Sequence, residues 1–199
     1  RLERMVEETL DGLQDPAQRN ALLITLAKAL LDNPERATDA VDGLQSILFE
    51  EPQHPEALGM LMSYFEKSGR SAELIDMLSS QLDAAESRND ADAIKITSLD
   101  LCRRLEADDP LRGVETLKRA LGHLPQDADL MRAVLERMDD DTDPLERAEL
   151  IEQLVKVELP DVAGPLALQL SATYEELQDP EAALRALQLG AERAPDNEE

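Results

Sequence analysis

The chain has 199 residues, 42% of them hydrophobic, so it is long enough to bury a substantial apolar core. Its 44 acidic and 20 basic residues give a net charge of −24, which repels phosphate backbones and anionic membranes and argues against nucleic-acid binding. The single cysteine, Cys102, excludes an intramolecular disulfide framework and a multi-cysteine zinc site. No apolar run approaches the roughly 18 residues that insertion into a membrane requires.

Prolines and capping residues divide the chain into short predicted helices. One set of prolines recurs at about 35 residues, with one double interval: Pro16, Pro52, Pro125, Pro160 and Pro195. The double interval contains the turn-like cluster Ser87-Arg88-Asn89-Asp90. A second set places an N-cap residue directly before a proline: Asn33-Pro34, Asp109-Pro110, Asp143-Pro144 and Asp179-Pro180. In the second repeat, Ser68-Gly69-Arg70-Ser71 takes this place. Two breaks per period predict two antiparallel helices per repeat.

In chain order, these breaks predict a leading helix at residues 1–14 and then five helix pairs. The predicted first helices of the pairs are 17–32, 55–68, 90–106, 127–139 and 162–177. The predicted second helices are 35–50, 71–87, 111–123, 145–158 and 180–193. We therefore predict an all-α fold of about 11 helices. Residues 1–199 are interpreted as a single array, in which a truncated leading unit at 1–16 precedes repeats at 17–52, 53–88, 89–125, 126–160 and 161–197.

Apolar residues within the predicted helices recur every three or four positions. In the last pair, one stripe is Leu166, Leu170, Tyr174 and Leu177, and the other is Ala183, Leu184, Leu187 and Ala191. This spacing is typical of a helix that buries one face. No segment shows the sustained alternation of a half-buried strand.

The period, the helix–turn–helix form and the small residues resemble the tetratricopeptide repeat. A small residue lies about twelve positions before a closing proline in four repeats: Ala40, Gly113, Ala148 and Ala183. The last repeat matches best, with Leu170, Tyr174, Ala183, Leu187 and Pro195 in family positions. Leu74 stands near the expected small position of the second repeat, and the family's tryptophan is absent. The resemblance implies an α-solenoid that winds into a right-handed superhelix.

The resemblance also implies a concave groove lined by the first helices. The family's groove positions correspond to Thr25, Ala29, Asp32, Met60, Ser63, Lys67, Arg103, Glu106, Arg132, Glu136, Ala172 and Glu175. Among these, Lys67, Arg103 and Arg132 are interpreted either as a basic ladder that orients an acidic peptide or as solvated charges and intrahelical pairs.

No set of residues in the sequence predicts catalysis, a cofactor or a metal. His54 and His123 lie in different turns and are interpreted as surface residues, and Cys102 lies within an apolar stripe as a small core residue. Asp139-Asp140-Asp141-Thr142-Asp143 is similar to the start of a calcium loop. However, its sixth position is Pro144 instead of glycine, and its twelfth is Leu150 instead of glutamate. We therefore expect a protein that is not an enzyme.

The sequence is best interpreted as a protein–protein interaction scaffold that binds a peptide or a helical segment in the concave groove. The alternative is an assembly module that forms homo-oligomers through repeat ends or the convex face. RNA-binding helical repeats share the period but need a basic groove. The acidity is explained by solubility or, more specifically, by a preference for a basic partner.

The two ends predict a segment of a longer protein. The chain begins at Arg1 and ends after Pro195-Asp196-Asn197, which is how such a unit enters the next. Uncapped ends would expose apolar surface and favour self-association. The excess of Ala, Leu, Arg, Asp and Glu over Lys is typical of a GC-rich bacterial genome. The expected location is the cytoplasm, with the periplasm left open.

Overall fold

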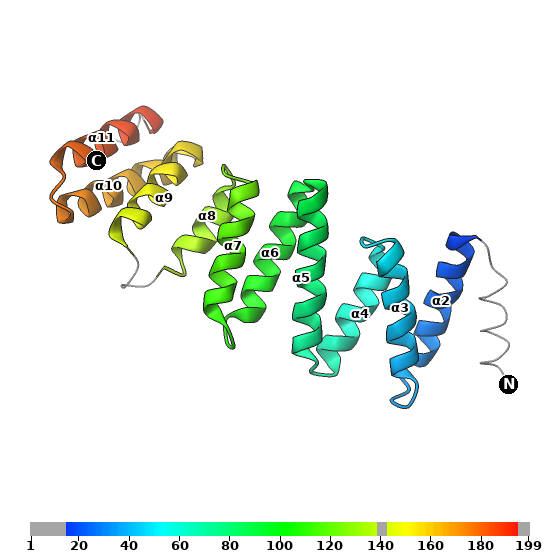
Figure 1. The fold of residues 1–199 in the computed structure, drawn as a ribbon. Coiled ribbons are helices and arrows are strands. Elements are labelled where there is room, and N and C mark those ends of the chain that lie inside the picture. Colours follow the sequence, from blue (N-terminus) through cyan, green and yellow to red (C-terminus); the bar gives the residue numbers. More distant parts are fainter. Residues whose placement is uncertain (1–14, 139–142, 195–199) are drawn as a thin grey trace, which may run out of the picture. The chain divides into compact units, whose positions relative to one another are not determined.

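The computed structural model describes residues 15–138 and 143–194, and every regular element within these ranges is an α-helix (Figure 1). The ten helices described are α2 (Pro16–Leu30), α3 (Ala37–Glu50), α4 (Pro55–Lys67), α5 (Ser71–Arg88), α6 (Ala91–Leu105), α7 (Pro110–His123), α8 (Ala128–Leu135), α9 (Pro144–Val157), α10 (Pro160–Glu176) and α11 (Pro180–Arg193). The predicted all-α class is confirmed. The leading helix predicted at 1–14 and the acidic run at 139–142 lie outside the described residues.

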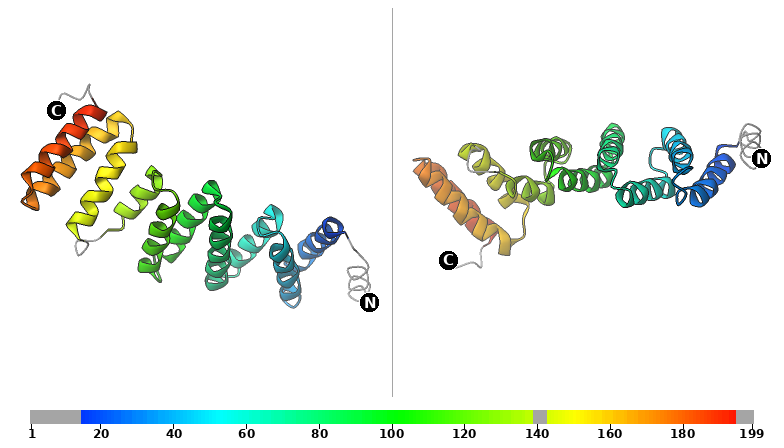
Figure 2. Two further views of the ribbon diagram at one scale, coloured as in Figure 1. Left: turned by 45° about the horizontal axis from the view of Figure 1, so that its top comes forward. Right: turned by 90° about the horizontal axis from the view of Figure 1, so that it is seen from below.

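The chain forms two compact units, Arg1–Ala84 and Ala85–Glu199, and their boundary falls within α5. In the first unit, α2 packs against α3, and α3 packs against α4. In the second unit, each helix from α6 to α11 packs against the next one in sequence. Short connections reverse the chain between them, and Figure 2 gives two further views of the resulting pairs. Within each unit, the helices are therefore paired as in tetratricopeptide-like repeats.

Aspartate begins most of these helices. At six N-caps the side chain accepts a hydrogen bond from a backbone N–H of the first turn: Asp15, Asp90, Asp109, Asp127, Asp143 and Asp179. Such a bond satisfies one of the donors left without a partner at a helix start. Proline follows the cap in α7, α9 and α11, as predicted.

The prediction that Asn33-Pro34 begins a helix is wrong. The Asn33 side chain accepts a hydrogen bond from the backbone N–H of Glu35, and its carbonyl accepts one from Arg36, which together close a turn. Arg36 then takes φ −123° and ψ −3°, outside the helical region, so α3 begins only at Ala37. Asparagine favours such local turns as readily as it favours helix starts.

Three helices end at a residue in the left-handed region. These residues are Gly69 (φ 67°), Asn89 (φ 52°) and Gln178 (φ 60°). After each of them, the next backbone N–H bonds to a carbonyl five residues earlier, as from Asp179 to Tyr174 at 2.9 Å. This closure satisfies free carbonyls at the helix end and lets the next helix begin within two or three residues. It accounts for the breaks predicted at Ser68–Ser71 and Asp179-Pro180.

Two predicted boundaries need correction. The helix expected at 127–139 ends at Leu135, because the next backbone N–H groups tighten into short-range bonds, such as Arg137 to Val134 at 3.0 Å. The helix expected at 162–177 is α10, whose first residue is Pro160. This helix therefore starts earlier than residue 162 and contains a second proline, Pro165, in its interior.

The small residues expected between paired helices are buried. Ala40, Ala148 and Ala183 are at most 5% exposed, and Gly113 is buried as well. A Cβ atom added at Gly113 would lie 3.3 Å from the Cys102 sulfur and 3.6 Å from its Cα, so α6 and α7 approach closely there. Leu74, which departs from the small-residue pattern, is also buried, with 3% exposure.

Candidate interaction surfaces

In the first unit, the predicted groove positions lie on or next to α2 and α4: Thr25, Ala29, Asp32, Met60, Ser63 and Lys67. Met60 and Ser63 are half-buried and the other four are exposed. Lys28 and Glu56 form an ion pair of 2.6 Å between the two helices. The predicted residues therefore belong to the solvent side of neighbouring first helices.

In the second unit, the predicted positions lie on or next to α6, α8 and α10: Arg103, Glu106, Arg132, Glu136, Ala172 and Glu175. All six are exposed. Glu106 forms an ion pair with Arg137, which joins the end of α6 to the turn after α8. This side of the unit is therefore rich in charged groups that already contact one another.

Both arginines predicted for the basic ladder are paired with carboxylates of the chain. Arg103 lies 3.3 Å from Asp100 on its own helix and is 69% exposed. Arg132 forms ion pairs with Asp129 and Glu158. Lys67 is exposed and makes no ion pair with the residues described. The interpretation as solvated charges and intrahelical pairs is therefore favoured over the ladder.

A network of ion pairs that sequence reasoning missed connects α6, α8 and the end of α9. Lys95 of α6 contacts Asp129 and lies 3.0 Å from Asp127. Arg132 joins Asp129 to Glu158, which is only 6% exposed. Hydrogen bonds from Lys95 and Arg132 lower the pKa of Asp129, and the bonds to Asp129 and Asp127 raise the pKa of Lys95. The network crosses three elements, so it stabilises their packing.

The histidines and the cysteine have structural positions. His54 caps α4, with its Nδ1 accepting a hydrogen bond from the Ala57 N–H at 3.3 Å. His123 lies at the end of α7, 3.9 Å from Glu86. Cys102 is 2% exposed, and burial raises the pKa of its thiol, which disfavours the reactive thiolate. The interpretation of Cys102 as a core residue is confirmed.

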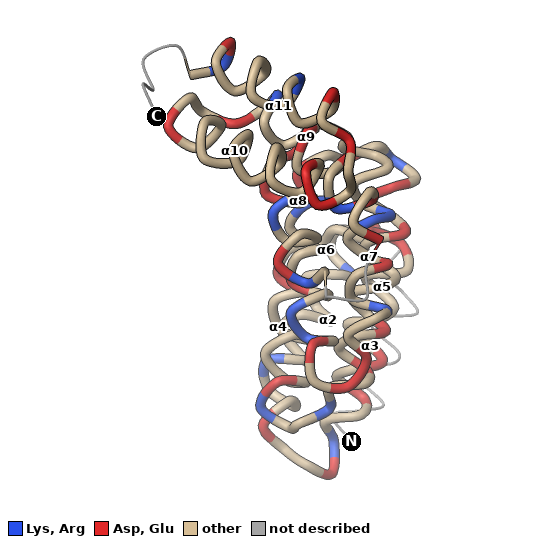
Figure 3. Tube along the Cα trace, turned by 90° about the vertical axis from the view of Figure 1, so that its left-hand side faces the viewer, with Lys and Arg blue, Asp and Glu red and all other residues tan. Residues whose placement is uncertain are grey.

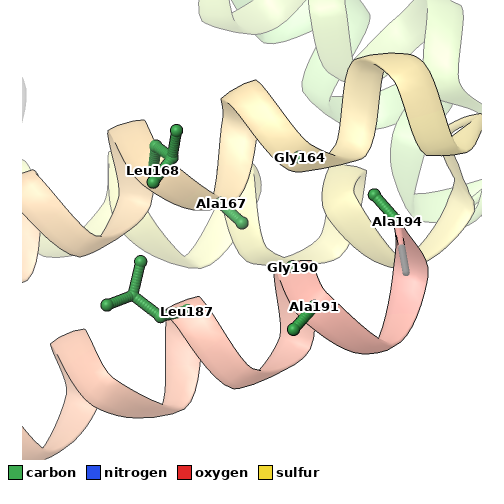
Figure 4. A pocket seen from close by; sticks show the side chains of 7 residues that line it. All are labelled: Gly164, Ala167, Leu168, Leu187, Gly190, Ala191 and Ala194. Carbon is green, nitrogen blue, oxygen red and sulfur yellow. The ribbon is translucent and has the colours of Figure 1, made fainter. Parts of the chain in front are cut away.

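An apolar cleft of about 290 Å³ runs between α10 and α11. Its lining is Gly164, Ala167, Leu168, Leu187, Gly190, Ala191 and Ala194, with Leu168 and Leu187 at one end and Ala194 at the other (Figure 4). Leu168 is 45% exposed and Leu187 is 41% exposed. Leu184, on the same helix as Leu187, is exposed as well. Exposed leucines beside a small-residue cleft form a surface on which another helix can pack.

Within the described ranges, no group of three or more His, Cys, Asp or Glu side chains has an arrangement that fits a metal ion. Of the calcium-loop candidate at 139–143, residues 139–142 lie outside these ranges, and Asp143 is the N-cap of α9. No described helix combines the length and apolar character of a membrane span. Figure 3 shows acidic positions along both units, with basic positions interspersed.

No family model and no curated protein matches the chain. Among solved structures, it is similar to a crystal structure of MamA protein, with 16% identity over 87% of this chain and 92% of that chain and a TM-score of 0.44. It is also similar to YrrB, titled "a TPR protein with an unusual peptide-binding site", with 16% identity over 88% and 87% of the two chains and a TM-score of 0.43. A third is TTC0263, a thermophilic TPR protein of Thermus thermophilus, with 20% identity over 89% and 93% and a TM-score of 0.36. Because these TM-scores are below 0.5, we assign the fold from the helix pairs within each unit and not from the similarity to these structures.

Proposed function

We propose that this chain is a non-catalytic protein-interaction scaffold in which each unit binds a peptide or helical segment along the exposed side of its own first helices, α2 and α4 in the first unit and α6, α8 and α10 in the second. The observation that carries the proposal is that all the predicted positions on these helices except the half-buried Met60 and Ser63 face solvent, while their neighbours form the core. In α6, for example, Arg103 is 69% exposed, whereas Leu101 and Cys102 are each 2% exposed. A face that is not needed for packing is available to a partner.

The charges on this face favour a partner segment that carries basic residues. Arg103 and Arg132 are occupied by carboxylates of the chain. Glu175 is exposed, and Glu136 is 74% exposed although it lies 3.7 Å from Arg137. Lys67 is the cation in the first unit that is positioned to meet an acidic group or a backbone carbonyl of the partner. Charge complementarity of this kind sets orientation and specificity more than affinity.

A random peptide display library selected on the immobilised chain tests this proposal. Enriched peptides are then measured against the double variant Lys67→Glu, Glu175→Lys, which keeps the net charge unchanged. The matched control is Lys118→Glu, Glu146→Lys, which swaps an exposed ion pair between α7 and α9. We expect binding to weaken about tenfold in the first variant, equivalent to about 1.4 kcal/mol, and to be unchanged in the control. Failure to enrich any peptide, or equal binding to both variants, would contradict the proposal.

The apolar cleft between α10 and α11 favours a second candidate, self-assembly. The cleft surface carries both protruding leucines, Leu168 and Leu187, and small residues that leave room for them, such as Gly164 and Ala191. Two copies related by a two-fold axis place the same patch on both sides, so each leucine can meet the small residues of the other copy. The candidate occupant is therefore a second copy of this chain.

Sedimentation velocity over a range of concentrations tests the assembly candidate. We expect the wild-type chain to associate and the variant Leu168→Glu, Leu187→Glu to remain monomeric. The control is Ile96→Glu, Leu111→Glu. It replaces two aliphatic side chains outside the cleft lining, Ile96, which is 68% exposed, and Leu111, which is 76% exposed. A wild-type chain that stays monomeric at every concentration rules this candidate out and leaves the peptide-binding proposal untouched.

A further inference from the structure

A second apolar groove, of about 530 Å³, lies within the first unit between α3 and the first part of α5. Each wall is a helical stripe with positions three or four residues apart. The α3 wall is formed by Gln45, Leu48 and Phe49, and the α5 wall by Glu73, Asp76, Met77, Ser80, Gln81 and Ala84. Leu61 of α4, which lies between these two helices in Figure 1, is fully buried beneath the groove. The groove therefore lies on the second helices, away from the first-helix face proposed above.

Phe49 is the most unusual residue of this groove. The chain has only two phenylalanines, and the other one, Phe65, is 2% exposed. Phe49 is 89% exposed, although it lies only two residues after the fully buried Ile47 of the same helix. A large aromatic ring left in water beside an apolar groove gains much by being covered, which is typical of a protein-binding surface. Met77, on the opposite wall, has an adaptable side chain that suits such a contact.

The rim of the groove is acidic. Its lining includes the carboxylates of Glu73 and Asp76. The helical residues 37–50 and 71–84 include no lysine or arginine. Arg70 lies just outside this range and forms an ion pair of 2.7 Å with Glu73. Asp76, itself part of the α5 wall, makes no ion pair with the described residues. A ligand for this groove therefore needs an apolar body and positive charge at its edges.

We propose that the α3–α5 groove binds an amphipathic helix of a partner protein, with bulky apolar side chains on one face and lysine or arginine along its edges. The apolar face packs on Phe49, Leu48 and Met77, and the flanking cations meet the carboxylates of Asp76 and Glu73. A groove walled by two helices accepts a third helix as helices pack on one another in bundles. A second copy packed through the same groove is a poor occupant, because it would bring the carboxylates of Glu73 and Asp76 from the two copies together.

The test uses a designed, fluorescein-labelled helical peptide of about 18 residues, or roughly five turns. Leucine occupies one face and lysine the two edges, and a second peptide carries glutamate in place of every lysine. Fluorescence anisotropy measures the Kd of each peptide for the whole chain at about 0.15 M salt, where long-range attraction to the acidic protein is screened. The groove variant is Phe49→Ser, Asp76→Lys. Its control is Leu111→Ser, Asp108→Lys, with the same charge change and the loss of another exposed apolar residue, Leu111 at 76% against Phe49 at 89%.

We expect the lysine peptide to bind the wild-type chain and the control alike and to bind the groove variant at least about tenfold more weakly, a difference of about 1.4 kcal/mol. The glutamate peptide should not bind. Equal weakening in the groove variant and the control would overturn the proposal, because it would mean that the peptide senses only net charge. Sedimentation that shows a wild-type dimer dissociated by Phe49→Ser would overturn it as well, because a second copy would then cover the groove. Loss of peptide binding to Lys67→Glu, Glu175→Lys but not to the groove variant would assign the peptide to the first-helix face.

Discussion

A Cβ atom added at Gly190 would lie 2.5 Å from the Cβ of Ala167, a separation that real Cβ atoms do not adopt. Both residues lie in the cleft between α10 and α11, and both are buried. The close approach of these two helices therefore depends on the absence of a side chain at Gly190. Because the atom it would meet is a Cβ, which cannot rotate away, the helices themselves would have to move apart.

The variant Gly190→Ala is therefore expected to lower the free energy of unfolding of the second unit by about 1–3 kcal/mol. This loss outweighs the gain of about 1 kcal/mol that alanine normally brings to a helix interior. Urea denaturation followed by circular dichroism measures it. Gly122→Ala in α7 is the control, because a Cβ there meets no atom within 4 Å. It should leave stability unchanged or raise it, and a Gly190→Ala chain as stable as this control would contradict the packing argument.

Gln178 holds a left-handed conformation at the end of α10, with φ 60°. This conformation disfavours residues that have a Cβ by roughly 1 kcal/mol, whereas glycine adopts it freely. We expect Gln178→Gly to raise the free energy of unfolding by about 0.5–1 kcal/mol, after allowing for the greater entropy of the unfolded chain. The same change at Gln188, inside α11, should lower it by about 1 kcal/mol. If both substitutions destabilise the chain, in thermal or urea unfolding, the helix-end conformation is not the one described.

The local breaks of the fold were predictable from the sequence because their signals are local. Asp109, Asp143 and Asp179 followed by proline mark helix starts, and these caps form between residues two or three positions apart. Asn33-Pro34 carries the same signal, and the Asn33 side chain accepts from the N–H two residues later, as Asp143 does, but Arg36 leaves the helical region and the segment closes a turn. The pattern alone does not distinguish these two outcomes.

Contacts between distant residues were not predictable in the same way. Gly190 and Ala167 are both small residues in apolar stripes, and their contact depends on the relative rotation of two helices. Phe49 continues the helical period of α3. Its exposure depends on which side of α3 the neighbouring helices leave uncovered, and the sequence pattern does not determine this. Repeat boundaries and first-helix groove positions remain predictions, supported by exposure but not by a bound partner.

Arg132 and Glu158 form the contact between α8 and the end of α9 that sequence reasoning missed. Glu158 is 6% exposed, so the variant Arg132→Met leaves a buried carboxylate without its charge-assisted partner. We expect a loss of about 1–3 kcal/mol in the free energy of unfolding. In a Glu158→Gln background, Arg132→Met should lower the free energy of unfolding by less than about 1 kcal/mol, because a neutral amide is easier to bury than a carboxylate.

A double-mutant cycle measured by urea denaturation gives the coupling between these two residues. The hydrogen bond of 2.9 Å from Arg193 to the Glu158 backbone carbonyl remains in all four proteins, so it does not contribute to the difference. Additive losses in the cycle would show that Arg132 stabilises the unit without Glu158, through Asp129 alone. Arg132 is a poor choice for testing ligand binding, because its replacement is expected to destabilise the fold as well.

Asp129 predicts a specific acid dependence of stability. Hydrogen bonds from Lys95 and then Arg132 lower its pKa in the folded chain. An unfolded aspartate titrates near a pKa of about 3.9, so the stabilisation is complete above that pH and is lost as the pH falls through the lower folded value. Because protonation also relieves repulsion among the 44 acidic residues, the wild-type curve alone does not isolate this effect.

The measured quantity is therefore the difference in free energy of unfolding between the wild type and Asp129→Asn. It should be positive and constant from about pH 7 to pH 5 and should shrink below about pH 4. The control, Asp108→Asn, replaces an exposed aspartate that makes no ion pair with the described residues, and its difference from wild type should stay near zero. A difference for Asp129→Asn that grows on acidification has the opposite sign and would mean that Lys95 and Arg132 do not stabilise the carboxylate form.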